Sequence, residues 1–108
     1  MLAAILGGVT AERVLVYLSR FGEGYARGIA RHFGIAPSPV QKQLAKFEEA
    51  GILASVEKGR TLVYLWNPRY PFLAELQALL VKAYDYLTPE EKERYTLRTR
   101  PRRRGKPA

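Results

Sequence analysis

Hydrophobic residues recur at helical spacing over residues 10 to 35, and turn-forming residues divide this part of the chain into two helices. We expect the first helix to run from an N-cap at Thr10 to about Arg20. Its apolar face consists of Val14, Leu15, Leu18 and Phe21. The sequence FGEG at 21–24 ends this helix, and YARGIARHFGI predicts a short second helix that Gly34 closes. The second helix places Ile29, Ala30 and Phe33 inward and leaves Arg27 and Arg31, four residues apart, outside.

The segment APSPVQKQLAKFEEAGIL at 36–53 predicts a third helix, over residues 37–50, with two chemically different faces. Proline fixes φ near the helical value and lacks an N–H group, so Pro37 and Pro39 fit only the first turn of a helix. The helix must therefore begin at Ala36 or Pro37, and Gly51 supplies the left-handed residue after its end. One stripe contains Val40, Leu44 and Phe47, and the opposite face carries Ser38, Lys42, Ala45, Lys46 and Glu49. We expect the first face to be buried and the second to be exposed.

The rest of the chain predicts a hairpin and two further helices. Two β-rich runs, 53–57 and 61–66, flank the turn Lys58-Gly59-Arg60, so the hairpin has a basic tip. Apolar residues over 72–87 predict a helix whose apolar stripe is wide for a small domain. Thr88, Pro89 and Glu91 give a capping-box signal for a last, short helix within 88–97. The expected fold class is mainly α with a small β-hairpin wing, a winged helix-turn-helix with additional C-terminal helices.

Composition limits the kind of chemistry that this chain can perform. Its 108 residues suit one domain. The chain has no cysteine and one histidine, so we expect no metal site, no cofactor and no Cys or His nucleophile. Glu90, Glu91 and Glu93 look like a solvated first helical turn rather than catalytic carboxylates, so we expect no enzyme activity. The run MLAAIL is short for a signal peptide, and no apolar stretch reaches the roughly 20 residues that span a bilayer, which favours a cytoplasmic protein without membrane contact.

Positive charge is concentrated in two parts of the chain. The formal net charge is +8. Residues 10–69 hold nine Lys/Arg against five Asp/Glu, whereas residues 70–95 hold three against five. Six of the nine residues from Arg98 to Lys106 are basic, and prolines interrupt that run, so we expect residues 98–108 to form a basic disordered tail. This distribution suits a polyanionic partner, although a solubilising surface would also account for the tail.

The order of three helices and a basic-tipped hairpin is that of a winged helix-turn-helix, and over roughly residues 5 to 87 the sequence resembles the ArsR-type bacterial regulators. The segment IARHFGIAPSPVQKQLAKFEEAGIL is similar to the part of those proteins that runs through the helix-turn-helix into the first strand of the wing. The matching positions are Ala30, Gly34, Val40, Leu44, residues 48–53, Gly59, Arg60, Tyr64, Asn67 and Pro68. The resemblance implies a DNA-binding transcriptional regulator, usually a dimer paired through its terminal helices. Metal sensing is not implied, because this chain lacks the Cys and His ligands of the metal-sensing members, and Ala36 stands where relatives commonly have a capping Ser.

If the third helix enters a major groove, its polar residues have the chemistry to contact bases and phosphates. A Gln side chain can pair with adenine and a Lys side chain can donate to guanine, so we expect Gln41 and Lys42 to contact bases. Ser38 and Lys46 are expected to contact phosphates. On the hairpin, Lys58 and Arg60 are expected to touch the backbone or the minor groove, and Arg27 and Arg31 could hold the backbone.

Three functional hypotheses remain open at this point. The first is a dimeric, sequence-specific double-stranded DNA-binding regulator, acting as a repressor, in which residues 1–87 hold the winged helix-turn-helix and the dimerisation helix. In such a dimer, Leu2, Ile5 and Leu6 and the apolar stripe at 72–87 are expected to meet their copies across a two-fold axis. The second is a protein-interaction adaptor, because NPRYPFLAELQALL is similar to a subgroup of winged-helix proteins associated with nucleotidyltransferases. The third is a non-specific nucleic-acid binder driven by the tail.

Overall fold

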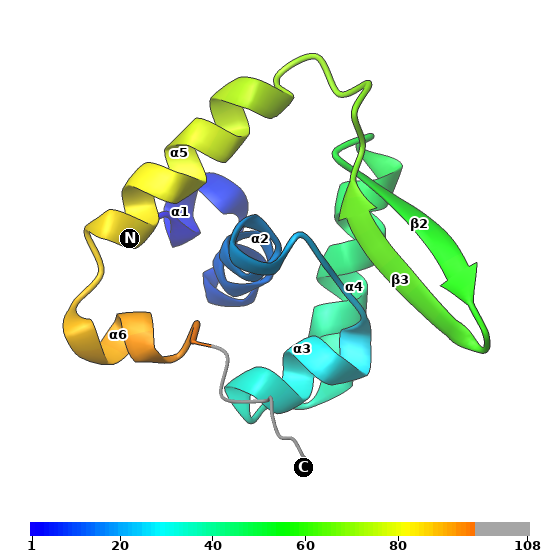
Figure 1. The fold of residues 1–108 in the computed structure, drawn as a ribbon, viewed down its shortest axis with the longest axis horizontal. Coiled ribbons are helices and arrows are strands. Elements are labelled where there is room, and N and C mark those ends of the chain that lie inside the picture. The colour runs from blue at the N-terminus through cyan, green and yellow to red at the C-terminus, as the bar shows by residue number, and fades with distance from the viewer. Residues whose placement is uncertain (97–108) are drawn as a thin grey trace, which may run out of the picture.

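The computed structural model describes residues 1–96, and residue 97 and the predicted tail at 98–108 lie outside this range. Six helices and three strands follow one another within it (Figure 1). They are α1 (Ala3–Leu6), α2 (Val9–Phe21), β1 (Glu23–Gly24), α3 (Ala26–Phe33), α4 (Pro37–Glu49), β2 (Leu53–Lys58), β3 (Thr61–Trp66), α5 (Leu73–Asp85) and α6 (Pro89–Glu93). Two helices joined by a tight turn and followed by a hairpin confirm the expected winged helix-turn-helix.

Helix α2 lies at the centre of the molecule, with α5 on one side and the pair α3 and α4 on the other (Figure 1). Leu15 and Leu18 of α2 are fully buried, as are Val40 and Leu44 of α4 and Leu80 of α5. These residues belong to the apolar stripes that the sequence predicts. Helices α4 and α5 each bury their apolar stripe against α2. The core therefore forms where the helices meet α2.

The connection between α3 and α4 follows the predicted geometry. Gly34 ends α3 with φ of 69°, and Gly51 follows α4 with φ of 84°, both left-handed conformations that glycine adopts without strain. Helix α4 begins at Pro37, and its N-cap, Ala36, offers no side-chain hydrogen bond. The first turn of a helix normally leaves four N–H groups without intrahelical partners, and Pro37 and Pro39 remove two of them. The helix therefore tolerates an N-cap residue that cannot accept a hydrogen bond.

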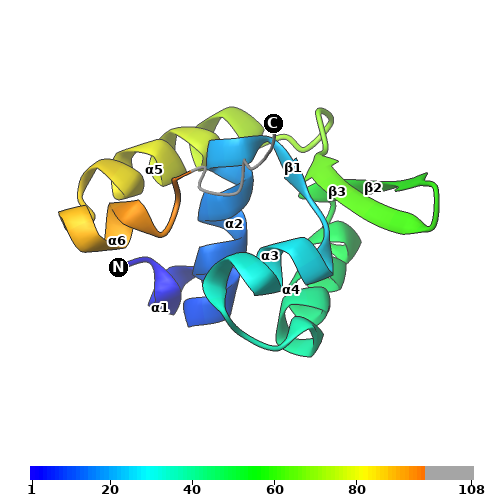
Figure 2. The same ribbon diagram turned by 60° about the horizontal axis from the view of Figure 1, so that its bottom comes forward.

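The sheet contains one strand more than the sequence predicts. Its order is β1-β3-β2, with both pairs antiparallel, and the β2–β3 hairpin projects away from the helices (Figure 2). Strand β1 pairs Glu23 with Leu65 and Gly24 with Tyr64, in a segment for which the sequence predicts only a helix-breaking turn. Lys58 pairs with Thr61 at the end of the ladder, so Gly59 and Arg60 alone form the turn at the tip.

The N-terminal segment differs from the prediction. Helix α2 begins at Val9 with Gly8 as its N-cap, so the prediction that Thr10 caps this helix is wrong. The short helix α1 precedes it, and the Glu12 carboxylate accepts hydrogen bonds from the backbone N–H of Leu2, at 3.0 Å, and from the amino group of Met1. These contacts hold α1 against α2, and Leu2 is buried there.

The C-terminal segment folds back onto the helix-turn-helix. The predicted capping box is present in α6, where Thr88 and Glu91 bond each other's backbone N–H groups. Tyr95 is buried, and its ring contacts those of Phe33 and Tyr84. His32 is buried and hydrogen-bonds the backbone carbonyl of Arg94. Among residues 1–96, no helix has both the length and the apolar character needed to cross a membrane.

Candidate nucleic-acid interface

The outer face of α4 is exposed over its whole length. Val40, Leu44 and Phe47 are buried, as the stripe predicts, because they pack into the core. The four residues of α4 for which nucleic-acid contacts are predicted are all exposed: Ser38, Gln41, Lys42 and Lys46. Ala45 on the same face is also exposed and small, so nothing bulky at this position keeps a partner away from the helix.

A hollow of about 200 Å³ separates α3, α4 and the hairpin, and three of the predicted contact residues meet in it. Arg27 comes from the first turn of α3, Gln41 from α4 and Arg60 from the tip of the hairpin. Tyr25, Ala26, Thr61 and Leu62 complete the lining. Within residues 1–96, no acidic side chain lines this hollow. The hollow therefore offers two guanidinium groups and one amide to an anionic or polar partner.

The Gln41 side-chain amide is hydrogen-bonded to a residue of the sheet. Its Nε2 donates a hydrogen bond of 3.0 Å to the hydroxyl of Tyr64 on β3. Tyr64 is 2% exposed and lies in the hydrophobic core. A long polar side chain at the surface thus has one fixed contact point in the interior.

The other predicted contact residues are exposed but differ in their surroundings. Lys58 forms an ion pair with Glu23 of β1 at 3.3 Å, and both side chains are more than half exposed, so the pair adds little stability and can be exchanged for a phosphate contact. The Lys46 Nζ lies 2.8 Å from the position that a Cβ atom would occupy if Gly7 carried a side chain, and 4.9 Å from the centroid of the Phe47 ring. Lys46 is therefore directed toward the turn between α1 and α2 and away from the hollow. Arg31 is exposed on α3 and does not line the hollow.

Two hydrogen bonds fix the hairpin relative to the helices. The indole Nε1 of Trp66 donates to the backbone carbonyl of Leu18 at 3.2 Å, and Asn67 Nδ2 donates to the carbonyl of Gly51 at 2.8 Å. Trp66 is also partly buried and packs against the hydrophobic core. These bonds anchor the base of the hairpin, at the end of β3, to α2 and to the turn after α4.

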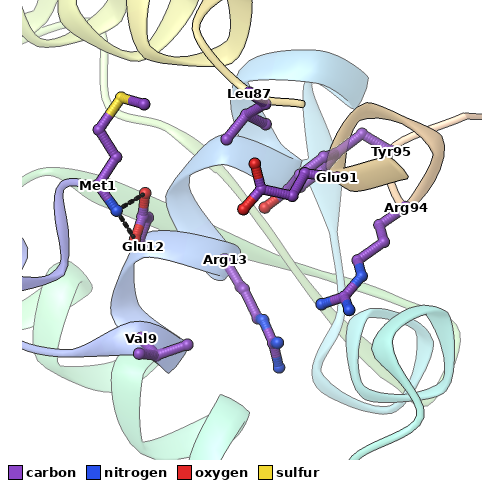
Figure 3. Close-up of a pocket in the computed structure, with 8 residues that line it drawn as sticks. All are labelled: Met1, Val9, Glu12, Arg13, Leu87, Glu91, Arg94 and Tyr95. Carbon is purple, nitrogen blue, oxygen red and sulfur yellow. Dashed lines mark hydrogen bonds and ion pairs between the residues drawn. The ribbon is translucent and has the colours of Figure 1, made fainter. Parts of the chain in front are cut away.

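A second hollow, of about 220 Å³, lies between α2 and α6 (Figure 3). Three of its charged side chains already have structural contacts. Glu12 bonds the N-terminal segment, the Arg13 guanidinium lies 5.5 Å from the centroid of the Phe33 ring, and Glu91 belongs to the capping box. Tyr95 also lines it, and burial, followed by the Glu12 carboxylate, raises the pKa of Tyr95 to about 12. This hollow therefore belongs to the packing between α2 and α6, and we do not assign it a binding role.

An apolar surface remains open on α5. Phe72, Leu79 and Tyr86 are spaced seven residues apart, so they lie along one side of the helix, and they are 62%, 37% and 67% exposed. Leu79 and Tyr86 line an apolar hollow with Leu2, and Ile5 of α1 is 72% exposed. The sequence predicts that Leu2, Ile5 and Leu6 are all left over for a partner. Leu2 is instead buried and Leu6 partly buried in their own chain.

Several features of the candidate nucleic-acid interface cannot be predicted from the sequence. Strand β1 has two residues, one of them a glycine, and neither periodicity nor propensity predicts so short a strand. The pairing of Glu23 with Lys58 depends on that strand. The contact between Gln41 and Tyr64 joins positions 23 residues apart, and only their proximity in the fold makes it visible.

No group of three or more His, Cys, Asp or Glu side chains that could hold a metal occurs in the described part of the chain. The candidate interface presents polar and basic side chains.

Comparison with known proteins agrees with this architecture. Residues 10–55 match the family model described as "Bacterial regulatory protein, arsR family". The crystal structure of AntR, an antimony-specific transcriptional repressor, is 22% identical, with a TM-score of 0.60 over 83% of this chain and 76% of that one. A MarR family protein of Mycobacterium tuberculosis, solved with salicylic acid, is 24% identical, with a TM-score of 0.51 over 87% of this chain and 76% of that one. Comparison with curated protein sequences finds no match. Residues 10–55 are thus similar to the helix-turn-helix of the arsR family, and the chain has a winged-helix fold.

Proposed function

We propose that this protein is a cytoplasmic transcriptional regulator that binds double-stranded DNA at specific sequences. The observation that carries the proposal is the hollow in which Arg27, Gln41 and Arg60 meet, from three different elements and without an acid among its lining residues. Such a surface can contact a DNA duplex at the groove and at the adjoining backbone together. The arsR-type helix-turn-helix at 10–55 supports the same function.

In this proposal α4 lies in the major groove. Gln41 and Lys42 contact base edges, since Gln pairs with adenine and Lys donates to guanine O6 and N7. Ser38 and Lys46 contact phosphates, and Lys46 does so beside the turn between α1 and α2, where its ammonium group lies. The two exposed prolines leave few backbone donors at the start of α4, so side chains carry most contacts there.

The hairpin and α3 hold the backbone on either side. Arg60 at the tip and Arg27 on α3 line the same hollow, and Arg31 extends the basic surface along α3. Lys58 exchanges Glu23 for a phosphate when DNA binds, because an exposed ion pair is worth less than about 1 kcal/mol. These contacts add affinity for any duplex and leave the choice of sequence to α4.

We further propose that the protein acts as a homodimer. The exposed apolar stripe of Phe72, Leu79 and Tyr86, together with Ile5, supports a two-fold interface between the α1 and α5 helices of two copies. Two copies related in this way contact half-sites about one DNA turn apart. Residues 1–87 then form the DNA-binding and dimerisation unit, and residues 98–108 act as a basic arm.

Repression follows if the dimer occupies a site that overlaps a promoter, and the AntR neighbour is described as a repressor. The test is to select duplexes from a random library with the purified protein and to sequence them. We expect an inverted repeat with half-sites about ten base pairs apart. Binding without enrichment of any sequence would instead favour the non-specific binder, and no binding at low salt would favour the adaptor associated with a nucleotidyltransferase.

A further inference from the structure

The side-chain amide of Gln41 has a fixed partner before any DNA is bound. Its Nε2 donates to the hydroxyl of Tyr64 at 3.0 Å. Tyr64 stands on β3, opposite Gly24 on one side and Ser55 on the other, in the middle strand of the sheet. Its ring is 2% exposed and belongs to the core cluster, so its hydroxyl cannot change position without disturbing the packing around it.

This hydrogen bond leaves the groups that a base contact requires. A Gln amide has two N–H donors and one carbonyl acceptor. One N–H is bound to Tyr64, which leaves the second N–H and the carbonyl oxygen for a partner outside. A bidentate contact to adenine uses one donor for N7 and one acceptor for the N6 amino group. The pairing with Tyr64 therefore orients the amide without using either group.

The identity of the anchor also matters. A free Gln side chain is flexible, and fixing it in one rotamer on binding costs conformational entropy. A tyrosine whose ring is locked in the core provides a rigid acceptor, so part of that ordering has already taken place in the folded protein.

We propose that Tyr64 is a positioning residue for base recognition, which holds the Gln41 amide in the orientation that selects one base pair. The inference rests on the proposed function and adds to it a buried residue that does not itself touch DNA. The structural alternative is that Gln41 serves only to satisfy the hydroxyl of Tyr64, and the experiment separates the two.

The experiment uses the full chain and the duplex that the wild-type protein selects from a random library. Dissociation constants are measured for this duplex and for duplexes with each base pair replaced in turn. The proteins are wild type, Gln41→Ala, Tyr64→Phe and the double variant. Tyr84→Phe is the matched control, because it also removes one tyrosine hydroxyl, but from α5 and not from a residue bonded to α4.

We expect Gln41→Ala to abolish the preference at one base pair of each half-site. Tyr64→Phe should reduce the preference at the same base pair by about three- to ten-fold, the range expected for one net hydrogen bond, and leave the other positions unchanged. The double variant should match Gln41→Ala, because Tyr64 acts through Gln41. Tyr84→Phe should behave as wild type.

Each other outcome has a distinct meaning. A wild-type protein that selects no sequence overturns the proposed function itself. A wild type with a clear preference, combined with an unchanged profile for Tyr64→Phe, overturns only the positioning role, and so does a uniform loss of affinity for all duplexes.

A measurement on the free wild-type protein keeps the inference testable even if Tyr64→Phe fails to fold. The Gln41 side-chain amide should be ordered in solution, with an NMR order parameter above the value of about 0.6 that marks flexible groups. A mobile amide would overturn the proposal.

Discussion

Ser55 Oγ of β2 donates a 2.6 Å hydrogen bond to the carboxylate of Glu48 in the last turn of α4. The bond ties the first strand of the hairpin to the proposed recognition helix, and the bonds of Trp66 and Asn67 fix the same sheet at its base. These three bonds connect the hairpin to α4, to α2 and to the turn after α4.

The proposed DNA contacts of α4 and the hairpin predict two classes of DNA-binding variant. Lys42→Ala should relax base preference and cost about 1–3 kcal/mol of discrimination, because the ammonium group that donates to a base edge is removed. Arg60→Ala should weaken binding to all sequences alike and make the salt dependence shallower, because the variant neutralises one phosphate fewer. Competition titrations with the selected duplex and unrelated DNA measure both effects.

Glu49→Ala is a suitable control for Lys42→Ala, since Glu49 is exposed on the same helix and is not assigned a contact. If Lys42→Ala left the selectivity ratio unchanged, the placement of α4 in the major groove would be wrong.

The apolar stripe on α5 predicts the state of assembly. Leu79→Glu should convert a dimer into a monomer at micromolar concentration, because it places a charge in the proposed interface where desolvation is costly. Light scattering coupled to size-exclusion chromatography measures the mass. Ala74→Glu is the matched control, because Ala74 is exposed on the opposite side of the same helix. A wild-type protein that is monomeric throughout this range would contradict the interface.

The basic run at 98–108 predicts a contribution to affinity without a contribution to specificity. Deleting these residues should weaken binding to specific and unrelated DNA by the same factor. The slope of log K against log salt should become shallower by about 0.9 for each phosphate that the truncated protein no longer neutralises. Titrations at several salt concentrations with both DNAs test this. A truncated protein that fails only in specific binding would show that the run contacts bases.

Tyr95 predicts how stability changes at alkaline pH. Its pKa is raised to about 12, first by burial and then by the Glu12 carboxylate. A tyrosine in an unfolded chain has a pKa of about 10, so the folded state holds the proton more tightly. The associated stability is fully present below pH 10 and is lost as the pH rises toward 12.

Tyr95→Phe has no proton to lose, so its unfolding free energy should fall less than that of wild type between pH 10 and 12. The difference should be on the order of 2 kcal/mol. Denaturant unfolding of both proteins at pH 8, 10 and 11.5 measures it. Parallel pH dependences would mean that Tyr95 does not remain protonated in the folded protein.

The sequence predicts most elements of the fold, for identifiable physical reasons. Helix α4 is predicted with its correct start because two prolines permit only one place for its first turn. The exposure of Ser38, Gln41, Lys42 and Lys46 follows from the helical period, and the capping box of α6 follows from local hydrogen bonding.

Features that depend on contacts between distant segments are not predictable in this way. Strand β1 exists because β3 offers it an edge, and the burial of His32 and Tyr95 arises because the segment after α6 folds back onto α3. The sequence misplaces the start of α2 because Thr10 is a good N-cap by type, whereas α1 and the Glu12 contacts fix the chain differently. Tertiary contacts outweigh local preference at each of these positions.

The prolines at the start of α4 also restrict how this protein can respond to its partner. Lengthening the helix by one turn at its N-terminus would bring Pro37 and Pro39 into the interior of the helix, where each ring would clash with the carbonyl four residues before it. Helix α4 therefore cannot grow backward when a ligand or duplex approaches. We therefore expect the start of α4 to stay at Pro37 when a duplex binds, so that adaptation to different sequences comes from side-chain rotamers or from the DNA itself.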